Sequence, residues 1–292
     1  MGRATAEVLR SRGHDVWIAD LPHSSDPKYV RCDLAEYREV ESLFEKSDFD
    51  YVYHLGAEFG RFNGEQFYER MWKANAIGTK NMIRLQEKKK FKMIFFSSSE
   101  IYGDYEGVMS EEVPIKFPIR QLNDYAISKW VNEKQIMNSA DRYGTETVRV
   151  RLFNSYGPGE YYSSFRSVVC IFVYRAMHDM PYTVYTKHRR TLTYIDDMVN
   201  GLCNIVDNFK AGEVYNIAGD QNVDMKELSD IILRLLGKQE ATFVRYETIE
   251  RHNTLTKITD NTKAKRDLNY KTSVTLEEGL KRTIEWQRSV YF

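Results

Sequence analysis

The stretch Phe91-Lys-Met-Ile-Phe-Phe-Ser-Ser-Ser-Glu100 indicates the fold class. Its first half is an apolar run of the kind that forms a buried strand in a parallel sheet. Its second half holds three hydroxyls and an acid, which places polar groups at the carboxyl end of that strand. In open α/β sheets this edge is where ligands bind. The alternative is a capping or turn cluster, because Ser and Glu are also common at such positions.

Strand and helix patterns alternate on both sides of this stretch. Further strands are expected at residues 15–20, 49–55 and 147–153, and helices at residues 2–13, 34–44, 67–88 and 123–142. Steady alternation of strand and helix implies right-handed crossovers and a doubly wound parallel sheet. The fold class that we predict is therefore α/β.

The pattern changes after residue 154. A turn is expected at Tyr156-Gly157-Pro158-Gly159, and residues 161–166 are aromatic and polar, as in a loop that faces a ligand. Helices are expected at residues 168–178, 196–207, 225–236 and 276–288, with short strands such as 213–217 between them. We therefore expect one domain over residues 1–154, to which part of about 190–217 returns, and a smaller α/β domain over residues 155–292.

Composition excludes several functional classes. The 292 residues include 42 Lys plus Arg and 42 Asp plus Glu, so the formal charge is zero, unlike that of a strongly basic nucleic-acid binder. Cys32, Cys170 and Cys203 lie far apart, which disfavours a disulfide framework or a zinc ribbon and fits a reducing cytoplasm. No apolar stretch approaches the roughly 20 residues that span a bilayer, and no leader pattern opens the chain. We expect a cytoplasmic protein with no nucleic-acid, membrane or metal partner.

The stretch Tyr125-Ala-Ile-Ser-Lys129 is the second feature that indicates reaction chemistry. Residues four apart on a helix share one face, so the phenol and the ammonium project the same way. An ammonium beside a phenol lowers the pKa of that phenol, which makes a base able to take a proton from a sugar hydroxyl. The alternative is a chance spacing, since Tyr and Lys four apart occur in many helices.

In this order and spacing, the motifs of the chain resemble those of the extended short-chain dehydrogenase/reductase family. The resemblance is to its nucleotide-sugar epimerases, dehydratases and decarboxylases, and it covers nearly the whole length. The matching elements are Ser97-Ser-Ser-Glu-Ile-Tyr-Gly103, Tyr125-x-x-x-Lys129, Arg151-Leu-Phe-Asn-Ser-Tyr-Gly-Pro158, Arg190-x-x-x-Tyr194-Ile-Asp-Asp197, and the ending from Lys263 to Leu280. The resemblance implies a Rossmann-like NAD-binding domain followed by a nucleotide-sugar-binding domain, and a homodimer built through the helices at 67–88 and 123–142.

The resemblance also implies a role for individual residues. Ser98 would hydrogen-bond the reacting sugar hydroxyl, Tyr125 would be the base, and Lys129 would hold the phenolate and the nicotinamide ribose. The NAD-binding residues would be Gly2, Asp20, Asp33, Leu34, Leu55, Gly56, Ala57, Asn75, Ser97, Tyr125 and Lys129. Asp20 follows the second strand of the family, where an acid accepts ribose hydroxyls and favours NAD over NADP. The substrate would contact Ser99, Asn154 and Arg190.

The roles of two residues have an alternative interpretation. Arg190 would meet the substrate diphosphate, a role that suits a guanidinium fork, but it also follows the basic run Lys187-His-Arg189 and could be a solvated arginine. His54 lies in an apolar strand, and we predict a hydrogen-bonded core residue rather than a ligand or an acid.

The chain departs from the family pattern at its beginning. Relatives have a strand followed by Gly-x-x-Gly-x-x-Gly, which holds the pyrophosphate at the positive end of the first helix. Gly2 aligns with the last of these glycines, so the first strand and two glycines are missing from this chain. Either the true start lies further upstream, or this is a truncated form with impaired cofactor binding. Smaller departures are Tyr185-Thr-Lys-His-Arg189, where relatives have a Gly-rich turn, and Asn269, which replaces a usual Gly.

The residue two places after Ser98 bears on the reaction. The resemblance implies that Tyr125 removes the O4 proton while NAD+ takes the C4 hydride, which leaves a 4-keto sugar. In dehydratases an acid at the position of Glu100 then removes the C5 proton, so we expect a 4,6-dehydratase. Decarboxylation of a nucleotide uronic acid, 4-epimerisation and non-catalytic binding on the same fold remain alternatives. Glu58 is either a second carboxylate near the sugar or a solvent-facing residue.

Overall fold

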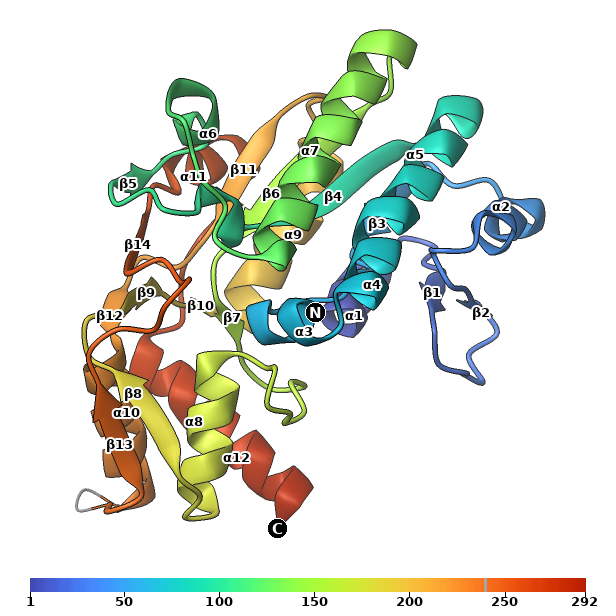
Figure 1. Cartoon of the computed structure of the whole chain (residues 1–292). Coiled ribbons are helices and arrows are strands. Elements are labelled where there is room, and N and C mark those ends of the chain that lie inside the picture. Colours follow the sequence, from blue (N-terminus) through green and yellow to red (C-terminus); the bar gives the residue numbers. More distant parts are fainter. Residues whose placement is uncertain (239–240) are drawn as a thin grey trace. The chain divides into compact units, whose positions relative to one another are not determined.

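A computed structural model describes residues 1–238 and 241–292, which divide into two compact units (Figure 1). Unit 1 comprises Met1–Ile101, Asn123–Arg151 and Leu202–Tyr215, and unit 2 comprises Tyr102–Leu122, Leu152–Gly201 and Asn216–Phe292. Each unit has its own hydrophobic core. The core of unit 1 gathers around Val40, Ile83 and Met93, and that of unit 2 around Val173, Leu228 and Leu280.

The elements of unit 1 alternate between helix and strand. In chain order they are α1 (Gly2–Ser11), β1 (Ile18–Asp20), β2 (Tyr29–Arg31), α2 (Tyr37–Lys46), β3 (Tyr51–His54), α3 (Arg61–Gln66), α4 (Tyr68–Trp72), the π-helix η1 (Lys73–Ile77), α5 (Gly78–Lys89), β4 (Lys92–Ser98), the 3-10 helix η2 (Ser99–Tyr102), α7 (Asp124–Tyr143) and β6 (Thr147–Leu152). Two further elements, α9 (Ile195–Asp207) and β11 (Val214–Ile217), contribute residues to both units.

Four strands form one sheet in the order β11-β6-β4-β3. β3 runs parallel to β4, with Tyr51 opposite Lys92 and His54 opposite Phe95, so both strands end at the same edge. The helices α5 and α7 lie side by side in Figure 1, and α7 contacts β4. β1 and β2 form a separate parallel pair. Parallel strands alternating with helices confirm the predicted α/β class.

Two helices of unit 1 differ from the expectation for physical reasons. The helix expected at 34–44 begins at Tyr37, because Asp33 forms a turn in which its carboxylate accepts a hydrogen bond from the Ala35 N–H at 2.9 Å. The helix expected at 67–88 is divided by the π-turn of η1, which contains the buried Asn75. π-turns inside helices occur often at functional sites.

Unit 2 is built from short strands and longer helices. Its elements are β5 (Val108–Met109), α6 (Val113–Lys116), β7 (Ser155–Tyr156), α8 (Val168–Met177), β8 (Tyr182–Tyr185), β9 (Arg189–Thr191), β10 (Thr193–Tyr194), β12 (Asn222–Asp224), α10 (Met225–Leu236), β13 (Val244–Glu247), β14 (Thr256–Thr259), α11 (Thr262–Leu268) and α12 (Leu276–Tyr291). A four-stranded sheet has the order β12-β9-β14-β5, and β8 pairs with β13 in parallel.

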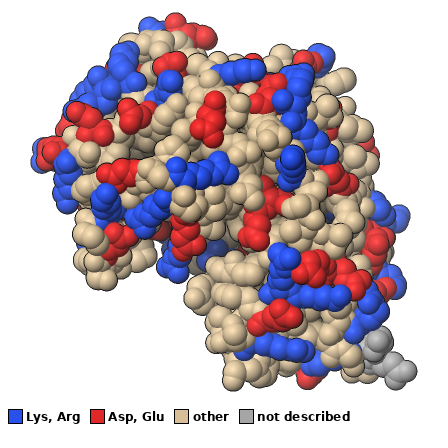
Figure 2. Space-filling model, turned by 180° about the vertical axis from the view of Figure 1, so that it is seen from behind, with Lys and Arg blue, Asp and Glu red and all other residues tan. Residues whose placement is uncertain are grey.

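Charges of both signs are mixed over the surface. On the face drawn in Figure 2, Lys and Arg lie among Asp and Glu, as the zero net charge would suggest. Ion pairs four residues apart on α10 and α12, such as Lys226–Asp230 and Lys281–Glu277, contribute to this pattern. Among the helices of the described residues, none combines the length and the apolar character needed to cross a membrane.

Candidate active site

The helix α7 sets the positions of Tyr125 and Lys129. It begins after Asn123, whose side-chain oxygen accepts a hydrogen bond from the Ala126 N–H at 2.9 Å, and it ends before Gly144 in a left-handed conformation with φ of 64°. Tyr125 and Lys129 lie in the first two turns, four residues apart. α7 packs against β4, so the sequence-predicted phenol and lysine lie beside the carboxyl end of that strand.

The structure brings Ser98 and Tyr125 together. Ser98 is the last residue of β4, and its hydroxyl lies near enough to the Tyr125 hydroxyl to act on the pKa of that phenol. Burial raises the pKa of Tyr125 to about 12, the Ser98 hydroxyl opposes that rise, and the charge of Glu100 adds to it. The phenol is therefore protonated at neutral pH, and its conversion to a base requires positive charge brought close to it.

Lys129 interacts with the backbone of β4 rather than with the phenol oxygen. Its Nζ donates a hydrogen bond to the Phe96 carbonyl at 2.8 Å and lies 5.9 Å from the centre of the Tyr125 ring. Burial lowers the pKa of Lys129 to about 8. In this structure the pKa of Tyr125 is raised rather than lowered, because burial of the phenol dominates.

Glu100 lies in η2, directly after the strand, and is half-buried. Its N–H donates a hydrogen bond to the Ser98 Oγ at 3.2 Å. Its charge raises the pKa of Tyr125, which shows that the carboxylate acts on the Ser98–Tyr125 pair. Between Ser98 and Glu100, Ser99 is buried. Three of the four predicted catalytic residues thus form one cluster, and Lys129 adjoins it from the next turn of α7.

The loop after β3 contains a glycine, Gly56, at a position where no side chain would fit. A Cβ atom on Gly56 would lie 2.3 Å from the Leu34 side chain, so Leu34 packs directly on the loop formed by Leu55, Gly56 and Ala57. A Cβ on Gly78 would also approach Leu34, at 3.0 Å. Four of the residues expected to contact NAD are therefore adjacent in space.

Asn75 connects this loop to α7. Its side-chain oxygen accepts a hydrogen bond from the Glu58 N–H at 2.8 Å, and its amide donates to the Glu58 carbonyl and to the Ser128 Oγ, both at 2.9 Å. Ser128 in turn donates to the Tyr125 carbonyl. The buried amide thus holds the loop after β3 against the first turn of the helix that carries Tyr125.

Glu58 has two polar partners within unit 1. Its carboxylate accepts hydrogen bonds from the Arg70 guanidinium, with Nε at 2.7 Å from Oε1, and from the Asn63 amide at 2.8 Å. The sequence left open whether this residue lies near the sugar or faces solvent. The contacts show a partly exposed carboxylate that joins the loop after β3 to α3 and α4.

The residues that would hold the adenosine half of NAD fit that group. Asp20 is the last residue of β1 and is exposed, which suits its carboxylate to the two hydroxyls of a ribose. Gly2 is the first residue of α1, and no side chain caps that helix, so its N-terminal amides suit a pyrophosphate. Asp33, by contrast, accepts a hydrogen bond from the Ala35 N–H and stabilises its own turn.

Sequence reasoning missed the buried partner of Ser97. This serine, expected to contact the cofactor, donates a hydrogen bond to the Glu133 carboxylate at 2.6 Å. Glu133 also pairs with Arg151, which sequence analysis quoted only as the start of a motif. The available signal was the spacing, because Glu133 lies four residues after Lys129 and eight after Tyr125 on the same helix face.

Asn154 and Arg190, two of the three expected substrate residues, both lie in unit 2. Asn154 has a positive φ of 33°, and its amide donates to the Thr191 carbonyl at 3.0 Å. The Arg190 guanidinium is buried and donates to the carbonyls of Arg189 and Leu255 and to the Asn253 side chain. The alternative of a solvated arginine is therefore wrong. Across residues 1–238 and 241–292, no group of three or more His, Cys, Asp or Glu side chains could hold a metal ion.

Three curated relatives resemble this chain over most of its length. It is 28% identical to UDP-N-acetyl-alpha-D-glucosaminuronate decarboxylase of Bacillus cytotoxicus, over 99% of this chain and 95% of that protein. It is 29% identical to UDP-glucuronate 4-epimerase of Thermodesulfobacterium geofontis, over 93% and 82%. It is 26% identical to dTDP-D-glucose 4,6-dehydratase of Mus musculus, over 93% and 77%.

The fold is also that of solved enzymes. The structure of UDP-glucose 4-epimerase from Thermotoga maritima matches with a TM-score of 0.88 at 24% identity, over 100% of this chain and 96% of the other. The model of the NAD dependent epimerase/dehydratase family matches residues 1–218. The chain therefore belongs to the NAD dependent epimerase/dehydratase family.

Proposed function

We propose that this enzyme dehydrates a nucleoside-diphosphate hexose to the 4-keto-6-deoxy sugar. The observation that carries the proposal is the cluster of Ser98, Tyr125 and Glu100 at the carboxyl end of β4, in which a hydroxyl, a phenol and a carboxylate act on one another. This cluster supplies a group for the sugar O4 proton and a separate carboxylate for a second proton transfer.

The first proton transfer is assigned to Tyr125 and Ser98. Tyr125, once converted to the phenolate, accepts the O4 proton as C4 is oxidised, and the Ser98 hydroxyl orients O4. When bound, NAD+ supplies the hydride acceptor for C4, the hydride that later reduces the sugar, and a positive charge near the phenol. The pKa of Tyr125 is raised to about 12 by burial, so such a charge favours the phenolate.

The second proton transfer is assigned to Glu100. A 4-keto group acidifies the C5 hydrogen, and a carboxylate two residues after Ser98 can remove that proton. The C6 hydroxyl then leaves with a proton as water, so the C5–H and C6–O bonds break and a C5–C6 double bond forms. Reduction at C6 and reprotonation at C5 complete the 4-keto-6-deoxy product. This chemistry needs the carboxylate, whereas simple 4-epimerisation does not.

A second candidate is a reaction on a nucleotide uronic acid. The two relatives with identities of 28% and 29% are, by name, a decarboxylase and a 4-epimerase of UDP-linked uronic acids. Decarboxylation would use the same C4 oxidation and would release carbon dioxide in place of water, while epimerisation would return the hydride to the opposite face of C4.

Product analysis separates these reactions. The NAD-loaded protein is incubated with UDP-glucose, dTDP-glucose, GDP-mannose, UDP-glucuronate and UDP-N-acetylglucosaminuronate, and the products are identified by mass spectrometry and NMR. We expect a product lighter by one water from a neutral hexose, and we expect Glu100→Gln to abolish that product while C4 oxidation continues. Release of carbon dioxide, or an isomer as the sole product, would replace the dehydratase by the corresponding alternative.

A further inference from the structure

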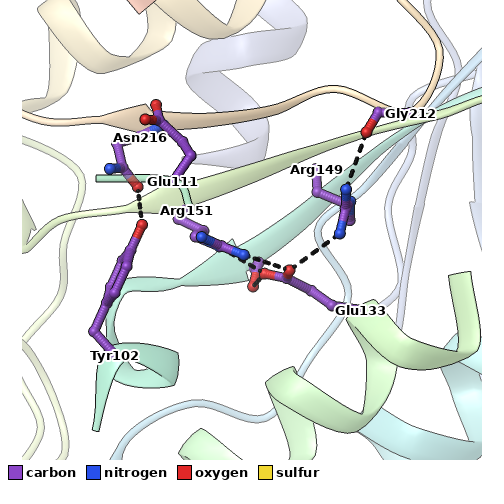
Figure 3. Close-up of polar contacts among 8 residues, drawn as sticks. Tyr102, Glu111, Glu133, Arg149, Arg151, Gly212 and Asn216 are labelled. Carbon is purple, nitrogen blue, oxygen red and sulfur yellow. Dashed lines mark hydrogen bonds and ion pairs between the residues drawn. The ribbon is translucent and has the colours of Figure 1, made fainter. Parts of the chain in front are cut away.

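The face of α7 that carries Tyr125 and Lys129 has a third polar member, Glu133. It lies one further turn along the helix and is completely buried. Its Oε1 accepts a hydrogen bond from the Ser97 hydroxyl at 2.6 Å. Arg151 donates to the same Oε1 from Nε at 3.0 Å and to Oε2 from Nη2 at 2.8 Å (Figure 3). Both carboxylate oxygens are therefore bonded.

The carboxylate is ionised in this cluster. Burial acts to raise the pKa of Glu133, but Arg151, Arg149 and the Ser97 hydroxyl outweigh that effect and hold its pKa below the ordinary value. Arg149 Nη1 lies 3.4 Å from Oε2, and the second guanidinium nitrogen of Arg149 donates to the Gly212 carbonyl at 3.0 Å. Two cations from β6 thus hold one anion from α7.

Three consecutive residues of β4 contact three successive turns of α7. Ser98 acts on the Tyr125 phenol, the Phe96 carbonyl accepts a hydrogen bond from Lys129 Nζ, and the Ser97 hydroxyl donates one to Glu133. A shift of the helix by one residue moves every side chain by 1.5 Å along the axis. The Ser97–Glu133 hydrogen bond opposes such a shift at Glu133, the last of the three α7 residues along the helix.

A buried ion pair is poor evidence for stability alone. Apolar side chains of similar volume can replace such a pair at little cost, because burying two charges removes much of the gain from pairing them. Apolar packing has no directional requirement, whereas a carboxylate bonded by a hydroxyl and a bidentate guanidinium defines one position. Glu133 is therefore suited to setting the position of α7 on β4.

We infer that Glu133, bonded to Ser97 and Arg151, is a positioning residue that holds α7 at the register on β4 in which Tyr125 meets Ser98. It acts through the helix and does not touch the substrate. This inference rests on the proposed function, because the catalytic roles of Tyr125 and Ser98 belong to that proposal. Misplacement of catalytic groups by about 1 Å costs on the order of 100-fold in rate.

Ser97→Ala tests the inference, with Ser139→Ala as its matched control. Ser139 is also buried, and it also joins α7 to a carboxylate, since its hydroxyl donates to Glu87 Oε1 at 3.0 Å. Both variants lose one Ser–Glu hydrogen bond. We expect Ser97→Ala to reduce kcat at least tenfold with KM and the Kd for NAD changed less than twofold, and Ser139→Ala to leave all three within twofold.

Rescue separates positioning from loss of stability. Ser97→Thr keeps the hydroxyl and should recover kcat to within threefold of the wild type. The thermal unfolding midpoints of Ser97→Ala and Ser139→Ala should be similar to one another, so that a difference in stability does not explain their difference in kcat. A weaker affinity for NAD in Ser97→Ala with kcat unchanged would overturn the inference, because Ser97 would then be a cofactor ligand. Equal losses of kcat in Ser97→Ala and Ser139→Ala would overturn it as well.

A spectroscopic measurement is independent of turnover. In protein labelled with 13C at the tyrosine ζ carbon, the Tyr125 resonance, assigned by its loss in Tyr125→Phe, reports the surroundings of the phenol, including the Ser98 hydroxyl, without NAD or sugar. We expect that resonance to move in Ser97→Ala and not in Ser139→Ala. If it does so while no nucleotide sugar is turned over, the positioning role stands and the proposed function fails. If turnover is found and the resonance moves in neither variant, the positioning role fails.

Discussion

Lys129 donates a hydrogen bond from its Nζ to the Phe96 carbonyl oxygen at 2.8 Å. The lysine is buried, and burial lowers its pKa from 10.5 to about 8. A buried lysine held by one carbonyl is costly for the folded state at neutral pH, because its charge is removed from water. This cost is consistent with a functional use of the ammonium beside Tyr125.

Lys129→Met should therefore stabilise the fold while abolishing turnover. Below pH 8 the lysine is protonated in both states and its burial opposes folding, by as much as about 3 kcal/mol. As pH rises from 8 to 10.5, the folded state loses the proton first, so the stability of the wild type rises. Urea unfolding at pH 7 and pH 10 should show an advantage for Lys129→Met that shrinks with pH. An advantage that is the same at both pH values would contradict this account.

His54 gives a pH dependence of the same direction in the acid range. It is buried, its Nε2 lies 2.9 Å from Thr79 Oγ1, and burial together with the Lys129 charge lowers its pKa to about 3. The prediction of a hydrogen-bonded core histidine is thus confirmed. Between pH 6.5 and 3 the unfolded chain binds the proton and the folded one does not, so stability falls as the solution is acidified.

We expect His54→Gln to unfold at a lower pH in acid than the wild type. Removal of the histidine removes its proton uptake on unfolding, and thus part of the slope between pH 6.5 and 3. The measurement is an acid titration followed by circular dichroism. His14→Gln is the control, because His14 is exposed. Acid midpoints that are equal in His54→Gln and His14→Gln would show that the buried histidine contributes nothing to the acid response.

Substitutions of Glu133 and Arg151 should have non-additive effects on the free energy of unfolding, because the two side chains form a buried ion pair. Glu133→Leu alone leaves the buried Arg151 without its carboxylate and should cost about 3–5 kcal/mol. The double variant Glu133→Leu, Arg151→Leu removes both charges and should cost less than Glu133→Leu alone. Chemical denaturation of the two variants measures this difference. A double variant less stable than the single one would show that the charges stabilise the fold beyond their pairing with each other.

Replacement of Asn216 should cause a large loss of stability in unit 2. The Asn216 amide donates to the carbonyls of Met109 and Asp260, and its N–H donates to Glu111. Its side-chain oxygen accepts from the Tyr102 hydroxyl at 2.7 Å (Figure 3). Asn216→Leu removes the three side-chain hydrogen bonds to Tyr102, Met109 and Asp260 and should cost about 2–4 kcal/mol. Thermal unfolding should show this loss.

The matched control for this variant is Asn208→Leu. Asn208 is exposed and makes a side-chain hydrogen bond to the Asn204 carbonyl at 2.9 Å. Its replacement should change stability by less than about 0.5 kcal/mol. Similar melting temperatures for Asn216→Leu and the wild type would refute the importance of the buried amide.

Local patterns in the sequence were enough to predict the central contact of the site. The apolar run before Ser98 predicted a strand whose end is polar, and the spacing of Tyr125 and Lys129 predicted a shared helix face. Parallel strands place their carboxyl ends at one edge, so the two features could be expected to meet. The proximity of the Ser98 and Tyr125 hydroxyls, through which Ser98 acts on the pKa of the phenol, is what that reasoning requires.

Other features depend on contacts distant in sequence. Arg151 is 18 residues from its partner Glu133, and no pattern in either segment indicates that the two side chains pair. The π-turn at Asn75 joins Glu58 and Ser128, which are separated by 70 positions. The direction of the Tyr125 pKa shift depends on burial, which the local spacing of phenol and lysine does not report.

The catalytic use of Tyr125 is the central claim, and single-turnover spectroscopy tests it most directly. The NAD-loaded wild type and Tyr125→Phe are mixed with the nucleotide sugar that the wild type converts, and reduction of NAD is followed by its absorbance. The account predicts that Tyr125→Phe slows this reduction by at least about 100-fold, the lower range for a general base, with the Kd for the sugar changed little. A Tyr125→Phe variant that reduces NAD at the wild-type rate would contradict it.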